Sequence, residues 1–464
     1  MNTERVGKRG LIVVLAGVAL FRFFVLFSTH QQDNTAMALK LGETARNVMN
    51  GHGFAWDPLY LQMLNEESLK QDPLRPQWEV FEKTPPPMFD ASRLQSFRGR
   101  PPGYSVILSV LWTLTGHLKF IYAQILFCLL DLVTVFLLWW LANALFGSRP
   151  ALGAAFLYGF HISFALLSIN PSHDAMSSFP LIAGACLLYW AIKKSWWFFI
   201  PAGILFGAAS LIRQEPMFIP IVFAGALFLA GMKKRAFQAL LLMQGLVILM
   251  NVPWNLRAKQ QFGESSPFTH SFSALLLEGI GETPNPWGIQ ASDVWLRGFV
   301  KGKGVDTPFH SKDFNRVCME EFSRIVRENP AWVAGSVVKR AVRCLMPTVM
   351  PIESSFYFYS TVLKKEGGFG GYVREHPLHM GVTAGLKGLW LLLWFGSIWT
   401  VVVVVRSGDQ ERKALVLALG GISVYYFLTH IPMHCEYRYL LPGYAPLVLC
   451  GVNGWFQMLG KKKG

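Results

Sequence analysis

Charged side chains are scarce in this 464-residue chain, where Asp, Glu, Lys and Arg make up 15% of the residues against 52% for hydrophobic ones. An average soluble domain carries about 25% charged residues. Apolar runs near the ~20 residues that an α-helix needs to cross a bilayer recur along the sequence. The composition therefore excludes an ordinary soluble domain and predicts an all-α, polytopic membrane protein.

Acidic residues are fewer than basic ones, 28 against 43, which gives a formal net charge of +15. Such a charge can indicate nucleic-acid binding, but here Lys and Arg stand in short clusters between the apolar runs. Clusters of this kind are typical of the residues that orient membrane spans. We therefore expect membrane lipid, and no nucleic acid, as a partner.

Cysteine is also rare: the chain has six, and none forms a C-x-x-C pair. This scatter indicates neither a zinc site nor a disulfide framework. Cys318 and Cys344 are a candidate pair because both are expected outside the cytoplasm.

A small-x-small cleavage site is lacking after residues 1–28, which have a basic start and then an apolar stretch. We therefore expect an uncleaved first span rather than a signal peptide. Together with the absence of a retention signal, this fits a bacterial inner membrane with the active face periplasmic or extracytoplasmic.

The orientation of the chain depends on one short apolar run, 104–117. The other runs cover roughly 11–28, 119–146, 150–169, 175–192, 196–212, 216–231, 236–254, 383–405, 414–430 and 439–458. If 104–117 does not cross, the clusters of Lys and Arg between the spans all fall on one face, as the positive-inside rule requires. We therefore predict about ten spans with both ends cytoplasmic, and a membrane-dipping or interfacial helix at 104–117.

Two long outer loops follow from this topology, 29–118 and 255–382. They suggest an N-terminal catalytic module (1–257), an extracytoplasmic loop with amphipathic helices (258–382) and C-terminal spans (383–464). In the second loop, Lys339, Arg340 and Arg343 fit an interfacial helix near lipid phosphates.

Acids and arginines gather on the outer face. Asp33 directly follows the first span, and the short outer turns add further candidates: Asp174, Arg213, Glu215, Arg257, Glu436 and Arg438. Arginine binds phosphate bidentately, and a carboxylate can deprotonate an acceptor or hold a divalent cation. This composition predicts a site for an anionic, lipid-linked substrate.

Structural roles compete with each of these assignments. Asp174 stands where an acid commonly caps a helix N-terminus. Arg213 and Glu215 can form an interfacial ion pair, and Arg438 can anchor the interface beside its neighbouring tyrosines. Both kinds of role stay open at this point.

Three polar residues fall inside apolar runs: Arg22, Asp131 and His161. An unpaired charge there costs about 3 kcal/mol or more. Arg22 is therefore expected to reach a carboxylate, a water-filled cavity or a lipid phosphate, and we count it among the candidate substrate-binding residues. For Asp131 and His161 a structural bond between helices is favoured over a functional one.

Ordered motifs extend over most of the chain. They are Asp33 followed by ETARNVMNGHGFAW, then RPPGYSVILSVLWTLTGH, LANALFGSRPALGAAFL, SHDAM, GILFGAASLIRQEP, PWNLR and finally RYLLPGYAPL. Their order resembles the GT-C superfamily of integral-membrane glycosyltransferases, in particular the protein O-mannosyltransferases and the lipid A aminoarabinose transferase. Two departures are Asn34, where many relatives have a second acid, and Arg-Pro-Pro-Gly at 100–103 in place of His-Pro-Pro-Leu.

The resemblance implies inverting transfer of a sugar from a polyprenyl-phosphate donor to a lipid, glycan or protein acceptor. Asp33 would be the catalytic base and Asp174 the second acid, while Arg213, Arg257 or Arg438 would hold the donor phosphate. It requires no cofactor and leaves open a divalent cation, Mg²⁺ or Mn²⁺. The alternatives are a transporter or flippase of a lipid-linked saccharide, favoured by Asp131 and His161, and a polymerase or ligase of such saccharides.

Overall fold

The computed structural model describes residues 3–28, 35–58, 60–61, 81–82, 94–96, 101–263, 272–307, 311–347 and 369–460. By internal contacts the chain forms two compact units. The first comprises Met1–Pro267 with Ser407–Ala418, and the second Phe268–Arg406 with Leu419–Gly464. The predicted division at 257 and 382 stays a prediction.

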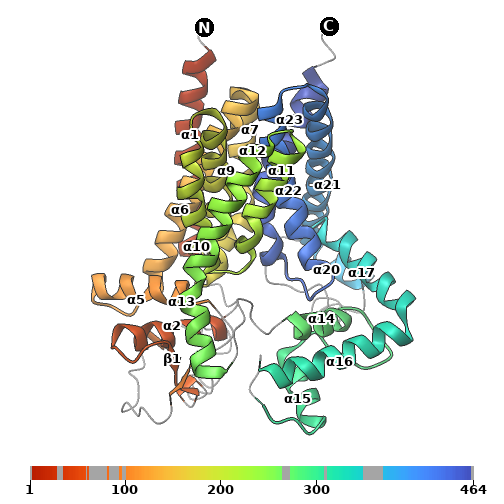
Figure 1. Ribbon diagram of the computed structural model, residues 1–464. Helices are drawn as coiled ribbons and strands as arrows, with labels where there is room; N and C mark the ends of the chain where they lie inside the picture. The colour runs from red at the N-terminus through yellow and green to blue at the C-terminus, as the bar shows by residue number, and fades with distance from the viewer. Residues whose placement is uncertain are drawn as a thin grey trace. The chain divides into compact units, whose positions relative to one another are not determined.

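Helices make up nearly all of the regular structure in the described part of the first unit (Figure 1). In chain order its elements are α1 (Thr3–Ser28), α2 (Thr35–Met49), β1 (Ala55–Trp56), β2 (Gln95–Ser96), α5 (Gly103–Thr115), α6 (Ile121–Phe146), α7 (Ser148–Phe160), α8 (Ile162–Ser168), η2 (His173–Met176), α9 (Ser178–Lys193), η3 (Trp196–Phe198), α10 (Phe199–Ser210), η4 (Glu215–Phe218), α11 (Ile219–Leu229), α12 (Lys233–Ala239), η5 (Leu240–Gln244) and α13 (Gly245–Phe262). The two short strands pair antiparallel.

All elements of regular secondary structure in the described part of the second unit are helices. Its elements are α14 (Phe272–Gly281), α15 (Asp293–Gly302), α16 (Lys312–Glu328), α17 (Pro330–Cys344), α20 (Phe369–Glu375), α21 (Pro377–Arg406), the larger part of α22 (Gln410–His430) and α23 (Tyr437–Gly460). Helices α14–α16 surround a small apolar core that includes Leu277, Leu296 and Phe314.

The predicted fold class, an all-α polytopic membrane protein, is confirmed. Within the described ranges, six helices are long and apolar enough to span a membrane, or seven when the bent pair α7–α8 is counted as one span. Each predicted apolar run falls on a helix or a bent set of helices. Runs 196–212 and 216–231 correspond to short apolar helices, and 439–458 to α23.

Helix α5 occupies the short run 104–117 on which the orientation depends. It has 13 residues, and at 1.5 Å per residue it is only about 20 Å long. Figure 1 shows it lying across the direction of α6. This geometry agrees with a helix that does not cross the membrane.

The bend between α7 and α8 explains one polar residue inside a span. His161 has extended backbone between the two helices, and its Nδ1 accepts the Ser163 N–H at 3.2 Å. A side chain in this position caps the new helix N-terminus. The two helices meet at 60°, so His161 has a local structural role.

Candidate functional site

Asp174 lies in the turn between α8 and α9 and is fully buried. Ser172, not Asp174, caps the short helix η2: its Oγ accepts the Asp174 N–H at 3.4 Å. The Ser172 hydroxyl also donates a hydrogen bond to Asp174 Oδ2 at 3.3 Å. The cap acceptor of η2 is thus the Ser172 hydroxyl, and the Asp174 carboxylate binds a further partner.

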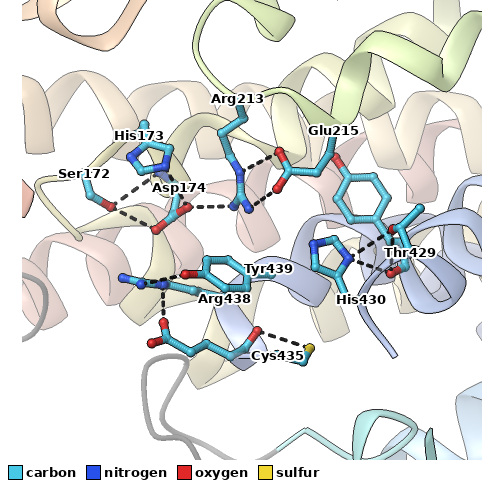
Figure 2. A network of polar contacts seen from close by, with 12 residues as sticks. Ser172, His173, Asp174, Arg213, Glu215, Thr429, His430, Cys435, Arg438 and Tyr439 are labelled. Atoms are coloured by element: carbon cyan, nitrogen blue, oxygen red, sulfur yellow. Dashed lines mark hydrogen bonds and ion pairs between the residues drawn. The ribbon is translucent and has the colours of Figure 1, made fainter. Parts of the chain in front are cut away.

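That partner is Arg213, just after the end of α10. Its Nη1 donates to Asp174 Oδ1 at 2.7 Å, and its Nε donates to Glu215 Oε2 at 3.0 Å. The Nη2 group donates to the other oxygen of Glu215. Figure 2 shows Arg213 between the two acids. Arg213 is 5% exposed and the Glu215 side chain 22%, so the cluster is buried on one side and reachable on the other.

This arrangement joins three residues that the sequence placed on one face. Two carboxylates share one guanidinium, and His173 Nε2 lies 3.6 Å from Asp174 Oδ1. With a neutral histidine the cluster carries a formal charge of −1. A planar guanidinium that binds two carboxylates fixes their orientation. In this structure Arg213 therefore positions Asp174; holding a phosphate would require it to exchange a carboxylate for that phosphate.

The residue after the Pro-Pro pair contacts the turn that leads to Arg213. The Gly103 N–H, at the start of α5, donates to Leu211 O at 2.6 Å, two residues before Arg213. A Cβ on Gly103 would come within 2.7 Å of that same oxygen. Glycine is therefore required here for the close approach of two backbones. The glycine at the end of the Arg-Pro-Pro-Gly departure thus has a packing reason.

Arg257 lies elsewhere in the first unit, on α13. Its Nη2 donates to Phe54 O at 2.8 Å, and its guanidinium lies 4.5 Å from the centre of the Trp254 ring. These contacts tie α13 to the chain just after α2. The predicted phosphate-binding role of Arg257 stays a prediction.

Arg22 reaches a carboxylate, the first of the three expected alternatives. Its Nε donates to Asp131 Oδ2 at 2.8 Å, and the Tyr158 hydroxyl donates to Asp131 Oδ1 at 2.7 Å. Arg22 is fully buried. The contacts join α1, α6 and α7 inside the helical bundle, as the structural reading of Asp131 predicts. The substrate-binding role of Arg22 stays a prediction.

Asp33, the predicted base, and Asn34 lie outside the described residues. Glu436 and Arg438 belong to the second unit and form an ion pair with each other at 2.5 Å. Arg438 Nη2 also donates to the Tyr439 hydroxyl at 3.0 Å, as Figure 2 shows.

A further buried carboxylate in the second unit escaped prediction. Glu282, after the end of α14, accepts hydrogen bonds from Arg340 Nε at 3.0 Å and from the Cys435 N–H at 2.7 Å. Arg343 donates to the same oxygen as Arg340, and His434 Nδ1 lies 2.6 Å from the other one. The expectation that Arg340 faces lipid phosphates is wrong, because it is 3% exposed and binds Glu282 instead. The residues of this cluster lie far apart along the chain, so the sequence did not indicate that they meet. The acids in LLLEGIGE, directly after an apolar stretch, were the signal in the sequence for a buried carboxylate here.

These contacts set the charge of Glu282. Burial opposes its ionisation, but the His434, Arg343 and Arg340 side chains outweigh burial and lower the pKa of Glu282 to about 2. Burial likewise disfavours the charged form of His434, yet its hydrogen bonds to Glu282 and Glu436 raise its pKa well above the usual value. Glu278 differs: burial raises its pKa to about 8. Near neutral pH, Glu282 is therefore ionised, whereas Glu278, four residues earlier on α14, is mostly protonated and neutral.

Metal binding and cysteine pairing complete the account of the predicted sites. No group of three or more His, Cys, Asp or Glu side chains within the described ranges is arranged to hold a metal. A bound divalent cation, Mg²⁺ or Mn²⁺, stays a prediction. All six cysteines are free thiols.

Residues 99–255 match the family described as dolichyl-phosphate-mannose-protein mannosyltransferase. The matched segment contains Asp174, Arg213 and Glu215. A comparison with curated protein sequences gave no significant match.

Solved structures give a match over nearly the whole chain. The archaeal oligosaccharyltransferase AglB from Archaeoglobus fulgidus, in complex with an inhibitory peptide and a dolichol-phosphate, is 13% identical with a TM-score of 0.54 and covers 98% of this chain. A crystal structure of the Archaeoglobus fulgidus oligosaccharyltransferase with zinc and sulfate is 12% identical, with a TM-score of 0.52 and 97% coverage. At this identity the similarity establishes the fold alone. This chain spans about half of each matched chain, 51% and 49%.

Proposed function

We propose that this protein is a membrane glycosyltransferase that moves a sugar from a polyprenyl-phosphate donor to an acceptor on the extracytoplasmic face. The observation that carries the proposal is the buried Asp174–Arg213–Glu215 cluster. It lies at the ends of apolar helices and within the segment that matches a mannosyltransferase family. Both archaeal structures that share the fold are oligosaccharyltransferases, and one of them has a dolichol-phosphate bound. This supports a lipid-linked donor.

In the proposed reaction the acceptor attacks the anomeric carbon of the donor. The new bond forms as the bond between that carbon and the phosphate oxygen breaks, and the polyprenyl phosphate leaves with the electron pair. Attack from the opposite side inverts the configuration. Asp33 takes the acceptor proton, and Asp174, fixed by Arg213, orients the donor. Fixed orientation and charge placement supply the largest rate contributions in reactions of this type.

Transport of a lipid-linked saccharide is the competing function. Its strongest argument was Asp131, an acid in the middle of a span. In the structure both oxygens of that acid accept hydrogen bonds, from Arg22 and Tyr158. A carboxylate bound in this way is a packing element, which favours the enzyme.

The test is transfer by the purified protein in lipid nanodiscs, supplied with a panel of polyprenyl-phosphate sugars and candidate acceptors. The measured quantity is the release of polyprenyl phosphate. We expect release by the wild type and its loss in Asp33→Asn and Asp174→Asn. The matched control is Glu411→Gln, which removes an acid of the exposed pair with Lys193. Release that continues unchanged in both aspartate variants would refute the proposed site. Saccharide movement across the bilayer of sealed proteoliposomes without release of polyprenyl phosphate would favour transport.

A further inference from the structure

We propose that Tyr104, Asn170 and Ser177 bind hydroxyl groups of the transferred sugar beside Asp174. All three side chains are buried, with exposures of 0%, 0% and 4%. The Tyr104 hydroxyl, both polar atoms of the Asn170 amide and the Ser177 hydroxyl have no hydrogen-bond partner in the part of the chain that the structure describes. This inference rests on the proposed function and extends it from the reaction to the recognition of the donor.

The three residues come from two neighbouring segments of the first unit. Asn170 and Ser177 lie in the turn that carries Asp174, four residues before it and three after it. Tyr104 comes from α5 and belongs to the apolar cluster against which Ala175 and Met176, the two residues after Asp174, pack. The Gly103 contact with Leu211 fixes the start of α5 against the Arg213 turn. The orphaned groups therefore belong to a single site.

Buried polar groups without partners are costly and rare, so several of them around one carboxylate need an explanation. A bound ligand that supplies the missing hydrogen bonds is one. Hydroxyl and amide groups are neutral, and each can donate and accept. They suit sugar hydroxyls, whereas a phosphate would favour cationic donors.

Tyr158 offers a matched control for Tyr104. Both tyrosines are fully buried in the first unit, but the Tyr158 hydroxyl donates to Asp131 at 2.7 Å. Removing the Tyr104 hydroxyl should leave the ligand-free protein as stable as before, because no hydrogen bond is lost. Removing the Tyr158 hydroxyl should lower the unfolding temperature and leave ligand affinity unchanged.

The experiment measures binding of two lipids, polyprenyl phosphate with and without its sugar, to the wild type, Tyr104→Phe, Asn170→Ala and Tyr158→Phe in nanodiscs. We expect Tyr104→Phe to weaken binding of the glycosylated lipid about tenfold, the effect of one well-placed hydrogen bond, and not to change binding of the bare lipid. Asn170→Ala should behave in the same way with a larger loss. The Tyr104→Phe unfolding temperature should stay at the wild-type value.

Two results would overturn the proposal. Equal weakening for both lipids would assign Tyr104 to the lipid phosphate, and no weakening for either lipid would leave it without a role in binding. Because the readout is binding, it separates this inference from the proposed function. Selective weakening for the glycosylated lipid in a protein that transfers no sugar would refute the glycosyltransferase activity and keep the sugar site.

Discussion

The first unit contains two buried arginine–aspartate pairs that differ in their surroundings. Arg22 and Asp131 lie inside the helical bundle, and the second oxygen of Asp131 is bound by Tyr158. Arg213 and Asp174 lie at helix ends, with a second acid on the guanidinium and partnerless groups nearby. The first pair joins helices. The second combines a fixed carboxylate with groups that lack partners, which is the pattern of a ligand site.

The difference teaches that burial of charge alone does not mark function. A buried ion pair costs desolvation in either setting. Both settings contain buried polar atoms without a hydrogen-bond partner among the described residues, Arg22 Nη1 in the first and the Tyr104 hydroxyl among others in the second. What separates the two is that the second pair lies at helix ends and shares its guanidinium with a second, partly exposed acid, Glu215. The predictions below test this distinction through separate effects on activity and stability.

The largest effect is expected on activity for Arg213→Ala. Loss of the guanidinium leaves Asp174 and Glu215 without a common partner and lets the two carboxylates repel each other. We expect turnover to fall about 10²–10³-fold, the range for loss of one positioned donor. Arg213→Lys keeps the positive charge but lacks the planar guanidinium, so its turnover should lie between that of the wild type and that of Arg213→Ala. The rate of polyprenyl phosphate release per folded molecule is the measurement, and wild-type turnover in Arg213→Ala would contradict the comparison.

The second-largest effect is expected on stability: Arg22→Met should lower the free energy of unfolding. Removing one partner of a buried pair leaves Asp131 uncompensated and costs about 3–5 kcal/mol. The double variant Arg22→Met/Asp131→Leu should recover much of that loss, because neither charge remains. Thermal unfolding in detergent measures both. The comparison expects turnover per folded molecule to stay near the wild-type value, whereas the predicted substrate-binding role of Arg22 would lower it. A loss of turnover as large as that of Arg213→Ala would show that the comparison is wrong.

The helical fold and the composition of the site could be predicted, but the pairings could not. Each apolar run corresponds to helix, because the length and hydrophobic periodicity of a segment are enough to predict its own secondary structure. The predicted membrane topology grouped Asp174, Arg213 and Glu215 as candidate site residues, since all three lie at the ends of predicted spans on the outer face. By contrast, Arg22 and Asp131 are 109 positions apart and Glu282 and His434 152 apart. Such contacts depend on helix packing, which no local pattern encodes. The same reason explains the wrong placement of Arg340.

A third buried cluster, around Glu282, extends the comparison to pH. The lowered pKa of Glu282 means that its contribution to stability is present above ~4.3, the unfolded value, and lost as the pH falls toward about 2. The raised pKa of His434 gives stability that is full below ~6.5 and lost as the pH rises through the folded value. Glu278 stays protonated in the folded chain up to about 8, so the folded state binds more protons than the unfolded one above ~4.3 and loses stability there.

From these signs we expect the unfolding temperature of the full chain to fall between pH 5 and pH 8. Glu278→Gln keeps a neutral side chain of the same shape and should flatten this decline by a few degrees. Glu282→Gln is the matched variant: it should lower the unfolding temperature across the range, because Arg340 and Arg343 lose their buried partner. A decline in Glu278→Gln as steep as in the wild type would contradict the assignment of a neutral Glu278.

The smallest effect is expected at exposed pairs, which set the baseline for the comparison. Arg316 and Glu320 lie 3.0 Å apart on α16, with exposures of 55% and 63%. Solvent screens such a pair, and ordering two long side chains costs entropy, so Glu320→Ala should change stability by less than about 0.5 kcal/mol. Its thermal unfolding should be insensitive to added salt within the same limit. A loss comparable with that of Arg22→Met would mean that the number of ion pairs, rather than their burial and the satisfaction of their neighbours, governs stability in this protein.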